Sequence, residues 1–203
     1  MIAIIDYGVG NLFSVEKAFT FLGADAKITN RPEEISAADR LVLPGVGAFG
    51  DCMKNLTRSG LIPSIRESLS HQKPLLGICV GLQILFDGSE ESPGVAGLGL
   101  LKGTVRKIRA DGLKVPHMGW NSLKITSPRQ KTDLFRRLGD APYVYFVHSY
   151  HAVPDDPHII TSVTEYGENL TASVAQGPIQ ATQFHPEKSG DVGLQLLKNF
   201  IET

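Results

Sequence analysis

The sequence predicts an α/β fold: a mostly parallel central sheet with helices on both faces and added antiparallel strands in the second half. Three observations predict it. In the first half, short apolar runs alternate with stretches at helical spacing, and the connections are short. These runs are continuously apolar, as expected for parallel strands covered on both faces. In the second half, short β-like runs are separated by turn residues, a pattern typical of hairpins.

The first half supplies the parallel strands and their helices. Residues 12–22 are expected to be helical, because apolar residues recur from Leu12 to Leu22 at the spacing of one helix face and Gly23 ends the pattern. The same reasoning places helices at 51–58, 62–70 and 80 to about 86, and strands at 2–5, 26–29, 40–43 and 75–78.

The second half begins with residues 88–99, which are rich in Gly, Ser and Glu and are expected to form a surface loop. After this loop, strands are expected at 103–108, 123–125, 144–147, 159–163, 171–175 and 179–184, and helices at 132–138 and 192–201. No repeat or linker divides the chain, so residues 1–203 are expected to form one domain.

Composition excludes several classes of function. The chain has 203 residues with 20 basic and 21 acidic side chains, and it lacks the basic excess of a nucleic-acid binder. Its two cysteines, Cys52 and Cys79, cannot build a disulfide framework or a four-cysteine metal site. No apolar run approaches the ~18 residues that span a bilayer, and the first residues do not resemble a signal peptide. We expect a cytoplasmic protein without a metal or cofactor.

A glycine-rich turn at residues 45–50 matches the dinucleotide fingerprint G-x-G-x-x-G. Binding of a dinucleotide also requires an acidic residue about 20 positions further on, at the end of the next strand. The nearest candidate, Glu67, lies inside a helical pattern. The glycines are therefore interpreted as allowing a tight turn from strand to helix.

Residues 77–81 read G-x-C-x-G between an apolar strand and a helix, the arrangement of a nucleophile elbow with cysteine in place of serine. Gly77 and Gly81 would let strand and helix approach closely, and the helix N-terminus would favour the thiolate of Cys79. The alternative is an ordinary buried cysteine. Cys52 has no comparable setting and is expected to be structural.

His185 and Glu187 decide between these readings. They flank Pro186 at the end of a predicted strand, where His185 can act as the base and Glu187 can orient it. The alternative is a surface histidine beside a solvated glutamate, but it leaves the elbow and the base at the carboxyl ends of two predicted strands unexplained. The remaining histidines show no spacing typical of metal ligands.

With its G-x-C-x-G elbow and downstream H-P-E, the chain resembles the class I (triad) glutamine amidotransferases, and the resemblance implies their fold. Over essentially its full length it further resembles the glutaminase subunits of imidazole glycerol phosphate synthases. The motifs that carry this resemblance are DYGVGNL at 6–12, LPGVGAF at 43–49, GICVGLQ at 77–83, PHMGWN at 116–121, YFVHSY at 145–150 and QFHPEKS at 183–189.

The resemblance implies that Cys79 attacks the side-chain amide of glutamine, with His185 as acid and base and Glu187 orienting His185. Elbow geometry makes the N–H of Val80 one oxyanion donor, and the second donor is expected from the turn that contains Val46 and Gly47. The resemblance also implies that the glutamine pocket is lined by Gln83, Ser149 and Tyr150. The alternative for Gln83 is an exposed polar position on a helix.

The resemblance further implies a heterodimer with a cyclase subunit, which would receive the ammonia before bulk water protonates it. Asn11, Trp120 and Tyr145 lie in matching motifs but have no catalytic use, so they are expected at the partner interface. The alternative for both aromatic residues is the core. Two other functions remain open: the glutaminase subunit of pyridoxal phosphate synthase, and a catalytically silent regulatory domain of the same fold.

Overall fold

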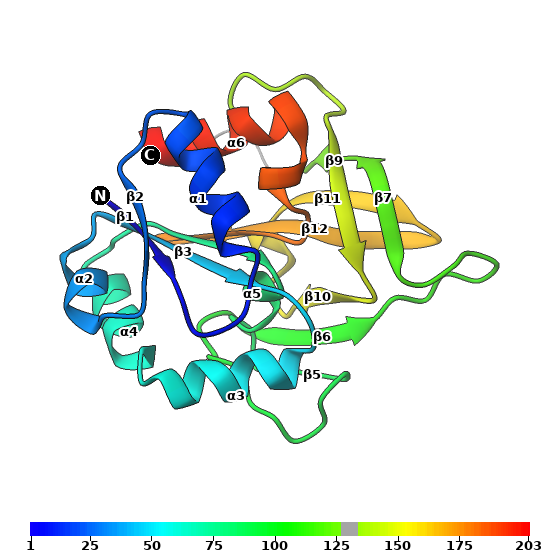
Figure 1. Cartoon of the computed structure of the whole chain (residues 1–203). Coiled ribbons are helices and arrows are strands. Elements are labelled where there is room, and N and C mark those ends of the chain that lie inside the picture. The colour runs from blue at the N-terminus through cyan, green and yellow to red at the C-terminus, as the bar shows by residue number, and fades with distance from the viewer. Residues whose placement is uncertain (127–133) are drawn as a thin grey trace.

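The computed structural model describes residues 1–126 and 134–203, and its main element in this part of the chain is an eight-stranded sheet (Figure 1). Five strands are parallel, and three antiparallel strands continue the sheet from one edge. In spatial order the strands are β2 (Ala26–Thr29), β1 (Ile2–Ile5), β3 (Arg40–Gly45), β4 (Leu75–Cys79), β13 (Ile179–Thr182), β12 (Glu168–Gln176), β11 (Ile160–Tyr166) and β8 (Lys124–Ile125).

Helices cover both faces of the parallel part. On one face α1 (Leu12–Phe21) packs against α6 (Gly190–Glu202), with the Phe19 and Phe200 rings 6.3 Å apart. On the other face lie α2 (Pro32–Ala37), α3 (Phe49–Ser59) and α4 (Ile62–Ser70), as Figure 1 shows. Strands β1, β3 and β4 are almost wholly buried between these layers. The predicted fold class is therefore confirmed.

Two small sheets stand beside the end toward which the parallel strands run (Figure 1). In one, β6 (Gly103–Lys107) lies between β10 (Tyr150–Pro154) and β5 (Gly88–Ser89). In the other, β7 (His117–Ser122) pairs antiparallel with β9 (Tyr143–His148). The carboxyl ends of β3 and β4 therefore face a wall built from the second half of the chain.

The structure corrects several predicted elements. The elbow helix α5 is only Val80–Gln83, rather than 80 to about 86. Strands β7 and β10 and helix α2 were not predicted, and the expected surface loop 88–99 begins with β5. Of the helix expected at 132–138, residues 132–133 lie outside the described residues and 134–137 form a turn. The turn has a physical cause: Arg137 has φ of 64°, and Asn199 Nδ2 donates to the carbonyls of Leu134 and Arg136.

No helix in the described ranges combines the length and the apolar character needed to cross a membrane. Among residues 1–126 and 134–203, no group of three or more His, Cys, Asp or Glu side chains is placed so that it could hold a metal ion.

Candidate active site

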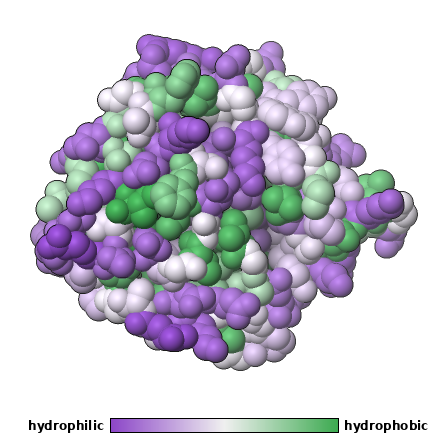
Figure 2. All heavy atoms as spheres, in the orientation of Figure 1, coloured by the Kyte–Doolittle hydropathy of each residue, from purple (hydrophilic) through white to green (hydrophobic). Residues whose placement is uncertain are grey.

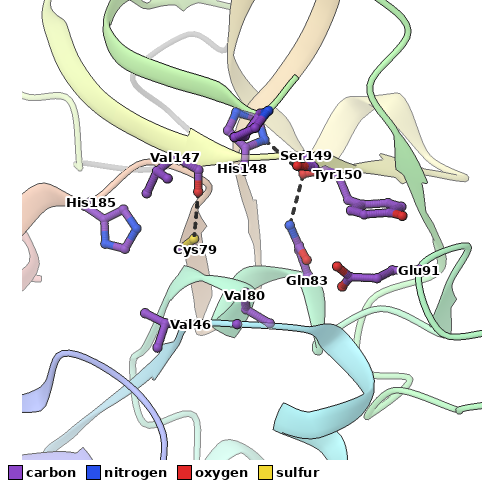
Figure 3. A pocket seen from close by; sticks show the side chains of 12 residues that line it. Val46, Cys79, Val80, Gln83, Glu91, Val147, His148, Ser149, Tyr150 and His185 are labelled. Carbon is purple, nitrogen blue, oxygen red and sulfur yellow. Dashed lines mark hydrogen bonds between the residues drawn. The ribbon is translucent and has the colours of Figure 1, made fainter. Parts of the chain in front are cut away.

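Cys79 ends β4 and stands at a strained turn into α5. Its φ of 56° and ψ of −113° lie where a residue with a side chain is rarely found. Both the strand and the helix on either side are buried, so the surrounding packing can hold this backbone in place. The strained turn points the sulfur into a cavity at the carboxyl end of the sheet (Figure 3).

The glycines around Cys79 are required by close backbone contacts. A Cβ added to Gly81 would lie 1.9 Å from the Leu43 carbonyl oxygen, and one added to Gly45 would lie 2.6 Å from the Gly81 nitrogen. The elbow therefore packs directly against the end of β3. This proximity brings the turn after β3 next to the nucleophile.

His185 and Glu187 form a buried pair beside Cys79. His185 Nδ1 and Glu187 Oε1 are 2.8 Å apart, and both side chains are almost fully shielded from solvent. His185 Nε2 has no hydrogen-bond partner among the described residues, and in Figure 3 its ring faces the cavity that holds Cys79. The imidazole thus has one nitrogen held by a carboxylate and the other available for proton transfer.

Charge at this site decides the protonation of His185. Burial alone lowers the pKa of His185, but its interactions with Cys79 and with Glu187 outweigh that and raise the pKa to about 10. A proton on Nε2 is therefore held next to the sulfur at neutral pH. The protonated imidazole can supply a proton for a leaving group.

A further side chain approaches the sulfur. Gln183 is fully buried, and its Nε2 lies 3.7 Å from Cys79 Sγ while its Oε1 accepts a 3.0 Å hydrogen bond from Gln83. An amide N–H directed at the sulfur stabilises negative charge there. Gln183 belongs to the motif that contains His185, but the sequence reasoning gave it no role.

Cys79 opens into a cavity of about 330 Å³. All the predicted oxyanion and glutamine-pocket residues line it, namely Val46, Gly47, Val80, Gln83, Ser149 and Tyr150. Gln83 is 3% exposed, not the exposed helix residue of the alternative, and its Nε2 donates a 3.0 Å hydrogen bond to the Tyr150 carbonyl (Figure 3). The residues expected to surround glutamine are therefore together in one place.

Glu91 also lines this cavity, and the sequence reasoning missed it. It lies in the segment expected to be a surface loop, and nothing in the sequence distinguishes it from its neighbour Glu90. Its Oε2 accepts a 2.7 Å hydrogen bond from the Phe49 N–H at the start of α3. It is the acidic side chain among the lining residues that the structure describes.

The backbone at the end of β3 faces the elbow helix. The β3–β4 register runs up to Gly45 opposite Cys79, and along this ladder the Leu41 N–H donates to the Pro74 carbonyl. A Cβ added to Gly45 would also lie 2.9 Å from the Val80 carbonyl carbon, so the start of the expected oxyanion turn packs against the residue that follows the nucleophile.

The expected interface residues are placed differently from one another. Trp120 on β7 is 56% exposed, and its ring meets that of Tyr145 edge-on at 6.3 Å. Tyr145 is partly exposed, so neither aromatic residue belongs to the core. Asn11 stands at the start of α1, and no hydrogen bond or ring contact among the described residues joins it to the other two. The interface role of all three stays a prediction.

Comparison with known proteins agrees with this geometry. The family described as glutamine amidotransferase class-I matches residues 3–203. Two solved structures share the fold: a glutamine amidotransferase (TM-score 0.77, 22% identity, covering 100% of this chain and 98% of that one) and PurLQS from Thermotoga maritima (TM-score 0.78, 18% identity, covering 99% and 97%). The chain belongs to the class I glutamine amidotransferase family, and it is an amidotransferase enzyme.

Relatives with higher sequence identity indicate which kind of class I glutamine amidotransferase this chain resembles. The imidazole glycerol phosphate synthase subunit HisH of Moorella thermoacetica is 51% identical, over 99% of this chain and 94% of the relative. The HisH subunit of Methanothermobacter thermautotrophicus is 50% identical, over 100% of this chain and 98% of the relative. This chain is thus similar over its whole length to one particular kind of amidotransferase subunit.

Proposed function

We propose that this chain is the glutaminase subunit of an imidazole glycerol phosphate synthase. It hydrolyses glutamine to glutamate and ammonia, and a cyclase subunit uses the ammonia to form imidazole glycerol phosphate and AICAR in histidine biosynthesis. The observation that carries the proposal is the buried Cys79–His185–Glu187 arrangement in a chain about half identical to HisH subunits. A cytoplasmic location accords with its two free cysteines and stays a prediction.

The reaction follows from the site. The Cys79 sulfur attacks the side-chain amide carbon of glutamine, and the carbonyl electron pair moves to oxygen. The tetrahedral intermediate collapses as His185 Nε2 gives its proton to the departing nitrogen. The nitrogen leaves as ammonia, and a γ-glutamyl thioester remains on Cys79. His185 then takes a proton from water, the water oxygen attacks the thioester, and glutamate leaves as the thiolate re-forms. Glu187 holds the imidazolium in position throughout.

The cavity suits glutamine along its whole length. The reacting amide belongs near Cys79, and the charged amino-acid end belongs further along the cavity. There the Glu91 carboxylate matches the α-ammonium group, and the Ser149–Tyr150 segment offers backbone and hydroxyl groups for the carboxylate. Gln83 supports this segment through its bond to the Tyr150 carbonyl.

Two arguments favour a partner subunit that covers this site. Ammonia released into water at neutral pH would be protonated and lost as a nucleophile, so a second surface must seal its path. In addition, Trp120 and Met118 leave 56% and 62% of their surfaces exposed on one side of β7, as an interface anchor would before docking.

The oxyanion turn explains how such a partner could control the rate. Tyr7 Oη donates to the Pro44 carbonyl at 2.6 Å, and Cys52 Sγ lies 3.3 Å from the Val46 carbonyl oxygen. These bonds hold the peptides on either side of Gly45–Val46, so reorientation is confined to this single peptide. Turning this peptide over would change the direction of the Val46 N–H and could point it at the oxyanion.

We expect glutaminase kcat to rise by about 10²–10³ when the cyclase subunit with its nucleotide ligand binds, the effect of adding one oxyanion donor. Steady-state glutamate release by the chain alone and in the complex measures this. Equal kcat values in the two states would contradict control by the partner, while leaving the triad unaffected.

The two alternatives have less support. The relatives at 47–51% identity are HisH subunits, which weighs against the glutaminase of pyridoxal phosphate synthase. The intact pairing of His185 with Glu187 beside Cys79 weighs against a catalytically silent domain.

A further inference from the structure

Two buried histidines that the reaction does not use lie against the glutamine cavity. His117 on β7 and His148 at the end of β9 are 3% and 6% exposed, and His148 lines the cavity itself. His117 Nδ1 and His148 Nε2 are 3.0 Å apart, and His148 Nδ1 is 2.9 Å from the Tyr150 carbonyl oxygen. At the other end of this series of contacts, Asn121 Nδ2 is 3.2 Å from His117 Nε2.

The Tyr150 carbonyl and the Asn121 amide together fix the direction of every bond in this series. Since a carbonyl oxygen only accepts, His148 Nδ1 carries a hydrogen, and since an amide nitrogen only donates, His117 Nε2 is an acceptor. A ring with an acceptor nitrogen is neutral, so His117 carries its hydrogen on Nδ1 and donates it to His148 Nε2. The Asn121 amide uses its second hydrogen on the Glu165 carbonyl at 2.9 Å. Both imidazoles are therefore neutral and in the Nδ1–H form.

Burial supports the neutral state. It lowers the pKa of His117 to about 4 and the pKa of His148 to about 3. A proton added to His148 Nε2 would face the Nδ1–H of His117 in the 3.0 Å contact, and one added to His117 Nε2 would face the amide hydrogen of Asn121.

These hydrogen bonds exclude a role of His148 as a base and indicate a role in fixing the pocket. Both of its ring nitrogens are engaged, so it cannot serve as a second base although it lines the cavity that contains Cys79. The Tyr150 carbonyl accepts from His148 on one side and from Gln83 on the other. The Ser149–Tyr150 segment is thus fixed by two buried donors.

We propose that His117 and His148 are positioning residues for glutamine: a neutral, directed histidine pair that fixes the Tyr150 carbonyl and with it the Ser149–Tyr150 part of the pocket. The inference rests on the proposed glutaminase function, because it concerns how that enzyme holds its substrate. It separates these histidines from His185, which takes part in the chemistry.

Three substitutions test the pair in the complex with the cyclase subunit. His148→Gln moves the amide donor to the Nε2 position and removes the bond to Tyr150, whereas His148→Asn retains a donor near the Nδ1 position. His117→Phe keeps a ring between Phe146 and Tyr166, which stack on His117 at 4.7 and 4.2 Å, but removes its donor. His151→Gln is the matched control, since His151 is equally buried but lies outside this chain of bonds.

We expect His148→Gln and His117→Phe to raise KM for glutamine about tenfold, the effect of one lost buried hydrogen bond with its partner left unpaired. Their kcat should stay within about threefold of wild type, and His148→Asn should restore much of the KM. The proposal is overturned if both variants match His151→Gln in KM, or if kcat falls while KM holds.

Nitrogen-15 NMR of the histidine side chains in the unmodified protein tests the pair without any substitution. At pH 7 we expect both rings to be neutral with the hydrogen on Nδ1, and an Nε2–H form or a charged ring at either position would overturn the proposal. A wild-type complex that releases no glutamate would refute the glutaminase function, whereas an active wild type with unaffected variants would refute only the histidine pair.

Discussion

Replacing Cys79 with alanine is expected to abolish glutamine hydrolysis, with a loss of up to about 10⁶ in kcat, as for removal of the nucleophile from a serine triad. No other described side chain at the site can form the thioester. Ammonium-dependent synthesis by the complex should persist, because the cyclase chemistry belongs to the partner. Glutamate release and imidazole glycerol phosphate formation, each assayed on the same complex, give the two readouts.

The second cysteine supplies the control for this assignment. Cys52 is a fully buried residue of α3, and burial raises the pKa of its thiol to about 11. A thiol-directed glutamine analogue should therefore modify Cys79 and leave Cys52 unmodified, as peptide mapping by mass spectrometry would show. Preferential modification of Cys52 would contradict the assignment of the nucleophile.

His185→Asn is expected to reduce kcat by about 10²–10⁴, because one imidazole carries both proton transfers. Glu187→Gln should cost less, since a glutamine oxygen can still accept from His185 Nδ1, at present 2.8 Å from the carboxylate. The comparison requires kcat of both variants in the complex, with circular dichroism to verify their folding. A folded Glu187 variant more impaired than the His185 variant would contradict the assigned roles.

The parallel part of the sheet could be predicted from sequence because β1, β3 and β4 are largely apolar runs that end at turn residues. The second half was harder to predict, for local reasons. Strand β7 contains Gly119 at φ of 124°, follows Pro116 directly and has no β-branched residue, so its local strand signal is weak. Its pairing with β9 depends on contacts between distant parts of the chain rather than on local preference.

The candidate active site also contains residues that local sequence predicts and residues that only the folded chain brings in. Cys79, His185 and Glu187 stand in short motifs whose spacing carries the chemistry, so the sequence alone points to them. Glu91 reaches the site through a contact with Phe49, far away in the chain, and no motif surrounds it. Gln183 stands in the motif of His185, but its contact with Cys79 arises only when the chain folds. Local motifs thus predict the reacting groups, whereas the folded chain defines the pocket around them.

The central claim, that this chain makes ammonia for a partner and keeps it from solvent, is tested most directly with amide-¹⁵N glutamine. The complex would be given this substrate together with the cyclase nucleotide and an excess of unlabelled ammonium at neutral pH, and the label in the imidazole product measured by mass spectrometry. The account predicts a product that carries the glutamine nitrogen almost entirely, and an unlabelled product when the complex contains Cys79→Ala. A wild-type product diluted to the label content of the bulk ammonium would contradict it.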